Sequence, residues 1–429
     1  MAKKGTYNGT FFGNFSSRLH GTPVRFGLLL GQEVENGLGD VLFAAATPPL
    51  DEEGDADAAP KDVASLLKSS SAGVSFSDWV VQHTSAVRKL LPAAMAPLGC
   101  FVVASEQAAK ELAALLVPIL RGFPEPLVLS IDPSTRKSSF WQLSVGAKPA
   151  LRPAQMKADS YKDYLLLWSV VNVDVFVQET YSPDANIDDL ATEVSRVVAE
   201  SLKSCVVTMA SDTGVPQVVE LASESLLVET VTPKECHQLK VSFLRPGSVL
   251  RAGDGPVRQR CVLTSSALLL RRNIELRRAV AQLMEEIASS SAERLRLALE
   301  ECEKPGRFLN LPWRGLFSPE DLQFPLWLGD YLMPDESHAA AKERLGQLLG
   351  VQEEALEQAP DFLDEHKLLT AHVGTYGPEP GSDRAQGKAP KASTSGSSGR
   401  SGSSGVPVAL TTCVAMVVLI LAVAIPKML

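Results

Sequence analysis

The chain has 429 residues, a net charge of −9 and six cysteines. This acidity disfavours binding to nucleic acids, because negative charges repel a phosphate backbone. The cysteines show no repeated spacing, so they predict no disulfide framework and are typical of a chain in a reducing compartment. No apolar stretch follows the opening MAKKGTYNGT, so the sequence predicts no secretory signal peptide.

Residues 24–204 predict a first α/β domain, preceded by an N-terminal extension of residues 1–23. Apolar residues recur at helical spacing in 78–91 and 105–119. Helices that alternate with strands are typical of an α/β sandwich, in which helices cover a sheet. An acidic and then Ser-rich stretch, 51–71, predicts a loop inside this domain. The short apolar runs that predict buried strands are Val24–Leu30, Val41–Ala46 and Pro97–Ala104.

The clearest strand is 171–177, where valine alternates with other residues at the period of a half-buried strand. A helix with one apolar face follows at 187–202. Residues 205–373 then predict a second α/β region, whose longest helix runs from about Ile274 to Cys302. Three serines, Ser289–Ser291, are expected to bend or break that helix. The predicted strands of this region are Cys205–Met209, Leu226–Val231, Leu239–Leu244 and Val257–Leu263.

Residues 308–337 combine four prolines with six aromatic residues. The prolines exclude a long helix, and aromatics at this density must be buried against the domain itself or against another chain. Both alternatives stay open: the segment covers the protein's own core, or it takes part in an interface, where Trp, Tyr and Arg are common hot spots. The candidate interface residues are Pro312, Trp313, Arg314, Trp327, Asp330 and Tyr331.

The C-terminal part predicts a tether and a membrane anchor. Residues 374–405 are rich in Gly, Ser and Pro without a large aliphatic residue, which predicts a disordered linker. Residues 406–425 carry no charge, and as a helix they span ~30 Å, the thickness of a bilayer core. Basic residues precede this run, so the bulk of the chain should face the cytosol. The predicted transmembrane tail anchor is represented by Val406, Leu410, Val414, Val418, Leu421 and Ile425.

A search for chemistry gives no catalytic, metal-binding or cofactor-binding residues. The sequence contains no paired CxxC or HxxxH spacing of a zinc site and no GxSxG nucleophile turn. His83 lies on the apolar face of a predicted helix, where we expect a buried histidine with hydrogen-bond partners rather than a general base. The sequence therefore predicts a protein that is not an enzyme.

Short stretches in a fixed order give the chain a family resemblance. The stretches are Gly27–Gln32, Ala46–Pro49, Asp78–Trp79, Leu91–Pro92, Leu98–Gly99, Leu311–Arg314, Asp330–Tyr331 and Asp335–Ser337. On these residues the sequence resembles the odorant response abnormal protein 4 family, whose members are tail-anchored endoplasmic-reticulum proteins linked to the trafficking of membrane receptors. With the terminal apolar run, the resemblance covers residues 24–350 and 406–425. Where that family places Gly-Gly after Leu-Pro, this chain has Ala93-Ala94.

The resemblance implies an MPN-like α/β sandwich. The active type of that fold holds zinc with a His-x-His pair and a downstream Asp, whereas this chain has only His83 between residues 76 and 104. A catalytically silent, dimer-forming version is therefore expected. The implied partner is the ubiquitin-fold-modifier-specific cysteine protease, as a heterodimer at the endoplasmic-reticulum membrane.

Two function classes follow from the resemblance. The first is a non-catalytic, single-pass membrane adaptor that binds, anchors and supports the protease. The alternative is a chaperone or trafficking factor for the folding and export of multi-span membrane receptors. Co-purification with the cytosolic portion distinguishes them: a stoichiometric protease favours the adaptor, and receptors with coat components favour the trafficking factor.

Overall fold

A computed structural model describes most of the chain up to residue 368. The tether and the apolar run at 406–425 lie outside the described residues. Among the described helices, none combines the length and the apolar character that a membrane crossing requires. The described residues belong to one compact unit, Met1–Tyr376. They are 3–19, 24–34, 37–50, 62–71, 73–177, 186–211, 217–219, 227–228, 236–244, 250–252, 257–270, 274–301, 311–322, 324–365 and 367–368.

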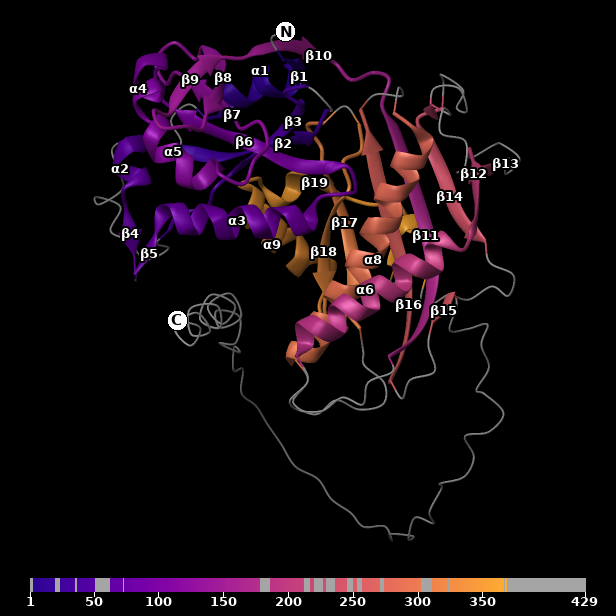
Figure 1. Cartoon of the computed structure of the whole chain (residues 1–429). Coiled ribbons are helices and arrows are strands. Elements are labelled where there is room, and N and C mark those ends of the chain that lie inside the picture. Colours follow the sequence, from indigo (N-terminus) through magenta and orange to yellow (C-terminus); the bar gives the residue numbers. More distant parts are fainter. Residues whose placement is uncertain are drawn as a thin grey trace, which may run out of the picture. The chain divides into compact units, whose positions relative to one another are not determined.

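An eight-stranded mixed sheet forms the first half of the described chain, in the order β10-β1-β3-β2-β6-β7-β8-β9 (Figure 1). Its central strands β2 and β3 are buried at every position, which explains their continuous apolar sequences. The strands are β1 (Lys4–Asn8), β2 (Phe26–Gln32), β3 (Asp40–Ala46), β6 (Met95–Val103), β7 (Leu127–Ile131), β8 (Ser138–Ser144), β9 (Ala150–Pro153) and β10 (Gln155–Asp159).

The predicted N-terminal extension is part of this sheet. Strand β1 pairs in parallel with both β3 and β10. Helix α1 (Gly9–Arg18) follows it and places Phe11, Phe12 and Phe15 in the core, where Phe11 lies 5.1 Å from the ring of Phe43. Within the predicted extension of residues 1–23, residues 4–18 therefore contribute to the first sheet and its core, and this contribution depends on strands that lie far along the chain.

Five helices surround or connect the strands of the first half. Ser105 caps α4 by accepting a hydrogen bond from the Ala108 N–H at 3.3 Å. Part of the predicted loop at 51–71 is helical, because Asp62 caps α2 through the Ser65 N–H. The helices after α1 are α2 (Val63–Leu67), α3 (Phe76–Leu90), α4 (Glu106–Glu111) and α5 (Ala113–Leu120), and a small hairpin joins β4 (Ser70–Ser71) to β5 (Val74–Ser75).

A second sheet has the order β13-β12-β14-β11-β15, and β16 pairs with β11 along 13 residues. Helices α6 (Ile187–Lys203) and α8 (Leu276–Glu301) lie side by side against one face of it (Figure 1). The change of sheet falls between Asp159 and Leu165, whereas the sequence predicts a boundary at residue 204. The strands are β11 (Leu165–Val177), β12 (Val206–Ala210), β13 (Gln217–Val219), β14 (Gln238–Leu244), β15 (Leu250–Ala252) and β16 (Val257–Leu269).

Helix α8 is continuous through Ser289–Ser291, where the sequence predicts a bend or break. Ser291 donates its hydroxyl hydrogen to the Ile287 carbonyl at 2.9 Å, so the side chain is satisfied within the helix. The predicted strand at Leu226–Val231 lies mostly outside the described residues, and Leu227 makes one isolated bridge to Glu275.

The last part of the described chain returns to the first sheet. A three-stranded sheet has the order β18-β17-β19, with strands β17 (Trp313–Pro319), β18 (Leu328–Leu332) and β19 (Leu356–Gln358). Helix α9 (His338–Leu349) contacts α3 and β3 (Figure 1) and ends at Gly350, which has φ 64°. Its Leu345 and Leu349 belong to the same apolar cluster as β2 and β3. Residues 313–356 therefore complete the core of the first sheet.

Candidate functional site

The six candidate interface residues lie on or beside β17 and β18, which form one antiparallel pair. Arg314 is paired with Tyr331 in the register of these strands. Trp313, Arg314 and Trp327 are each less than a tenth exposed, and Pro312 is buried as well. Asp330 and Tyr331 are half-buried. The structure thus brings the predicted residues together and packs four of them inside the protein's own unit.

Glu365 is the centre of a buried polar cluster around these strands. Its carboxylate accepts hydrogen bonds from the Thr264 N–H at 2.6 Å, the Thr264 hydroxyl at 2.8 Å and the Arg314 N–H at 2.7 Å. It also pairs with Arg294 at 2.7 Å, and neither side chain is more than 1% exposed. The donors come from β16, α8 and β17, so one carboxylate joins three elements.

Two arginines and one tyrosine extend the cluster. The guanidinium carbons of Arg294 and Arg314 lie 5.5 and 5.8 Å from the centre of the Tyr331 ring. Arg314 is also paired with Glu286 of α8. The Tyr331 hydroxyl donates to Ser290 at 3.0 Å. Burial opposes the charge of Arg294, but the carboxylate of Glu365 outweighs it and raises the pKa of Arg294.

Asp330 belongs to a second, less buried group. Arg344 of α9 donates to its carboxylate at 2.9 Å and to Glu336 at 2.5 Å. Burial nevertheless raises the pKa of Asp330 above its ordinary value, although Arg344 lowers it in part. These carboxylates, like Glu365, hold arginines that join secondary-structure elements. Such an arrangement stabilises the fold, because each of these carboxylates is engaged by an arginine of another element.

Sequence reasoning missed Glu365, Arg294 and Glu286. The burial of Arg294 could have been inferred from the sequence, because Arg294 lies seven residues after Ile287 and so shares the buried face of α8. Glu365 carried none, since its partners Thr264 and Arg314 are 101 and 51 residues away.

His83 is buried in α3, and both ring nitrogens have partners. Its Nε2–H donates to the Leu348 carbonyl at 2.7 Å, which leaves Nδ1 to accept from the Thr47 hydroxyl at 3.3 Å. Burial lowers the pKa of His83 below its ordinary value. His83 thus links α3 to α9 and to the loop after β3, and its hydrogen bonds are satisfied within the core.

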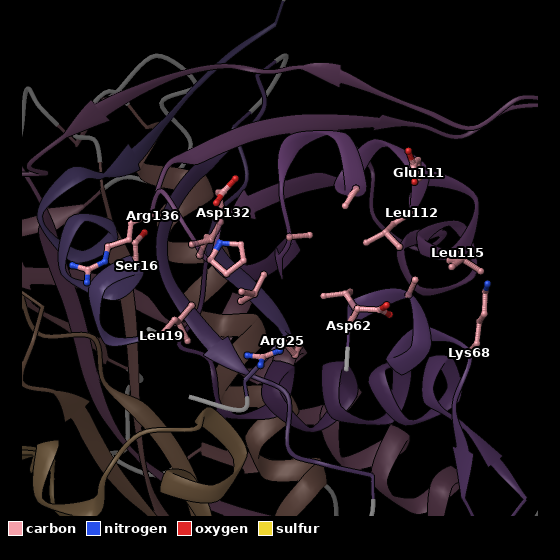
Figure 2. A pocket seen from close by; sticks show the side chains of 17 residues that line it. Ser16, Leu19, Arg25, Asp62, Lys68, Glu111, Leu112, Leu115, Asp132 and Arg136 are labelled. Atoms are coloured by element: carbon pink, nitrogen blue, oxygen red, sulfur yellow. The ribbon is translucent and has the colours of Figure 1, made fainter. Parts of the chain in front are cut away.

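A recess of about 730 Å³ opens where the parallel strands β6 and β7 end (Figure 2). Carboxyl ends of parallel strands are common ligand sites in α/β folds. Figure 2 shows Asp132 and Arg136 on one side of the recess and Glu111 and Lys68 on the other. The remaining labelled residues that line it are Ser16, Leu19, Arg25, Asp62, Leu112 and Leu115.

Two carboxylates of the recess have local structural roles. Asp132 accepts from the Ser134 hydroxyl and from the N–H groups of Ser134 and Thr135 at 2.6–2.9 Å, which lowers the pKa of Asp132 to about 2. The Ser65 N–H likewise lowers the pKa of Asp62. Ser16 is the one hydroxyl among the lining residues, and it donates to the Phe12 carbonyl at 3.1 Å. The recess therefore offers binding surface without a paired nucleophile and base.

Comparison with known proteins identifies the family. The sequence matches the ODR4-like family, described as odorant response abnormal 4-like, over residues 27–358. The chain belongs to this family. The matched range includes β17, β18 and α9, so the buried arginine cluster is built largely from residues of the family region.

No curated protein matches the sequence. Among solved structures, the chain is similar to the crystal structure of UfSP from C. elegans, with a TM-score of 0.45 and 10% sequence identity. The similar region covers 82% of this chain and 57% of the other, so the chain spans little more than half of that protein's length.

Proposed function

We propose that this protein is a non-catalytic adaptor of the endoplasmic-reticulum membrane that binds, anchors and supports the ubiquitin-fold-modifier-specific cysteine protease. Membership of the ODR4-like family carries this proposal. In it, the first α/β half is an MPN-like domain that lacks chemistry of its own and pairs with a related domain of the protease. Residues 406–425 hold the complex at the membrane, and the bulk of the chain faces the cytosol.

The polar side chains support a scaffolding role. The Glu365 carboxylate joins β16, α8 and β17, because it accepts from the Thr264 N–H, the Arg294 guanidinium and the Arg314 N–H. His83 uses both ring nitrogens within the fold, which leaves neither free to act as a base. Residues of this kind give a rigid body on which a partner can be held, and rigidity lowers the ordering cost of binding.

The decisive experiment is co-expression of the full-length chain with the protease, followed by size exclusion and analysis of the complex. We expect a one-to-one heterodimer and a higher yield of both proteins, since paired apolar surfaces aggregate when exposed alone. A chain that elutes apart from the protease, and that purifies instead with multi-span receptors, would favour the trafficking role.

The anchor is tested separately at membranes. Removal of 406–429 should release the protease from the membrane and slow the processing of membrane-bound substrates, with little change for a soluble substrate. Equal processing of both substrates with and without these residues would contradict an anchoring role while leaving the heterodimer untouched.

A further inference from the structure

A second recess, called the two-arginine recess below, lies between the loop that follows α5 and the hairpin of β8 and β9 (Figure 1). Its volume is about 340 Å³, at the lower end of the range of ligand sites in proteins. The structure describes residues 73–177 without a gap, so both walls of the recess are complete. The residues that line it are Arg121, Phe123, Pro124, Glu125, Pro126, Gln142, Leu143, Ser144, Val145 and Arg152.

The loop wall is held in place by backbone hydrogen bonds and by proline. Where α5 ends, the Phe123 N–H donates to the Leu120 carbonyl at 3.1 Å. At the other end of the loop, the Leu143 N–H of β8 donates to the Pro126 carbonyl at 2.9 Å. Pro124 and Pro126 further restrict the backbone, because their rings fix φ. A site whose walls are already fixed loses little free energy to ordering when a ligand binds.

Two arginines of the recess have no acidic partner. Arg121 and Arg152 are exposed, and neither forms an ion pair or a side-chain hydrogen bond with the residues that the structure describes. The one carboxylate of the recess does not neutralise them, because Glu125 accepts from Lys3 at Oε1 and from Gln142 at Oε2. The recess thus keeps an excess of positive charge in a chain whose net charge is −9. Such a local reversal of charge favours an anionic partner.

A hydroxyl and two guanidinium groups suit the oxygens of a phosphate. Gln142 is paired with Arg152 across the hairpin, and Ser144 lies two residues further along β8, so all three share one face of the sheet. The Ser144 hydroxyl has no hydrogen-bond partner in the described part of the chain. Arginine binds phosphate through paired N–H groups, and a phosphorylated side chain carries about two negative charges near neutral pH. A carboxylate has one charge and two oxygens, so it satisfies fewer of these donors.

Apolar side chains beside these donors favour a peptide over a free ion. Val145 is 50% exposed and Phe123 is half-buried, and both line the recess. A free phosphate ion would leave these side chains in water. A peptide with an apolar residue next to its phosphorylated one would cover them and gain the free energy of that burial.

We propose that the two-arginine recess binds a phosphorylated segment of a partner protein. Arg121 and Arg152 bind the phosphate, and the Ser144 hydroxyl donates to one of its oxygens. Phe123 and Val145 contact an apolar residue next to the phosphorylated one. The site is separate from the proposed pairing with the protease, and it does not depend on that pairing.

Fluorescence anisotropy with the full-length chain tests the site. The probe is a labelled peptide in which one phosphoserine is flanked by valines, and the same peptide without phosphate is its reference. We expect the phosphorylated form to bind about tenfold more tightly or better, because only the phosphate forms charge-assisted hydrogen bonds with both arginines. Arg121→Gln and Arg152→Gln should each weaken its binding about tenfold, and Arg152→Lys should restore part of it by keeping the charge without the fork. Val145→Ala should weaken binding about threefold.

Arg88→Gln is the matched control, because Arg88 is an exposed arginine of α3 that does not line the recess. It should leave binding unchanged, and circular dichroism should give every variant the melting temperature of wild type, since all the replaced side chains are exposed. Equal binding of the two peptides, or unchanged binding in both glutamine variants, would overturn the proposal. Inorganic phosphate that binds as tightly as the peptide would reduce the recess to a site for free anions. Binding to vesicles of phosphatidylcholine and phosphatidylserine that depends on Arg121 and Arg152, in place of peptide binding, would assign the recess to a membrane surface and would also overturn it.

Discussion

Replacement of Glu365 by alanine should be among the most destabilising single changes in this chain. The variant leaves Arg294 as a buried charge without its partner, and it removes the acceptor of the Thr264 and Arg314 N–H groups. Loss of one partner from a buried ion pair costs roughly 3–5 kcal/mol, so we expect a decrease of about 4 kcal/mol in the free energy of unfolding. For a unit of this size, that corresponds to about 5 °C in melting temperature.

A double variant separates the cost of the unpaired Arg294 charge from the cost of the Thr264 and Arg314 N–H groups that lose their acceptor. Arg294→Leu with Glu365→Leu removes both charges but leaves the two N–H groups unpaired, so it should lose only about 2 kcal/mol. Arg196→Ala is the surface control, because Arg196 forms exposed pairs with Glu193 and Glu200, whose charges are screened by solvent and contribute little to stability. Thermal unfolding followed by circular dichroism measures all three. A Glu365→Ala protein within about 1 °C of wild type, or a double variant less stable than the single one, would refute this reasoning.

Four further predictions concern other parts of the chain. Burial lowers the pKa of His83, so as pH falls below about 6.5 the unfolded chain takes up a proton before the folded chain does. The melting temperature should therefore fall between pH 7.5 and 5.5, and it should fall less in His83→Gln. Ala94 has φ 70°, so Ala94→Gly should raise the urea midpoint by the equivalent of about 0.5–1 kcal/mol, and a decrease would argue against strain there. A Cβ at Gly329 would clash with the Arg314 guanidinium, so Gly329→Ala should lose about 1–3 kcal/mol in the same assay, where an unchanged midpoint would contradict the packing. Removal of 406–429 should make the protein extractable by carbonate without lowering its melting temperature; continued membrane retention would refute the anchor.

Local sequence patterns predicted the strands and helices in which one face is buried along the length of the element. The alternation at 171–177 lies within β11, because that strand has one face under α6 and α8. The apolar face at 187–202 corresponds to α6, which begins at Ile187. Gly350 ends α9 with a positive φ, as a residue without a Cβ can do at no steric cost.

Features that depend on distant partners escaped the same reasoning. Residues 4–8 have no strong apolar period, and they form a strand inside the sheet only because β3 and β10 flank them. Glu365 looks like a surface carboxylate until Arg294 and Thr264 are placed beside it. The candidate interface residues lie together on or beside β17 and β18, and their contacts include Glu286 of α8 and His338 and Arg344 of α9. The aromatic content of the segment gave no sign of those contacts.

The return of α9 to the first sheet has a consequence for folding during synthesis. Strand β3 ends at Ala46, yet Leu345 and Leu349, which share its core, are made about 300 residues later. At about 5–20 residues per second, the apolar surface that α9 covers stays open for roughly 15–60 s on the ribosome. During that interval the growing chain is the species most exposed to aggregation. Cellular yield should therefore depend on chaperones that bind the nascent chain more than on the stability of the finished fold.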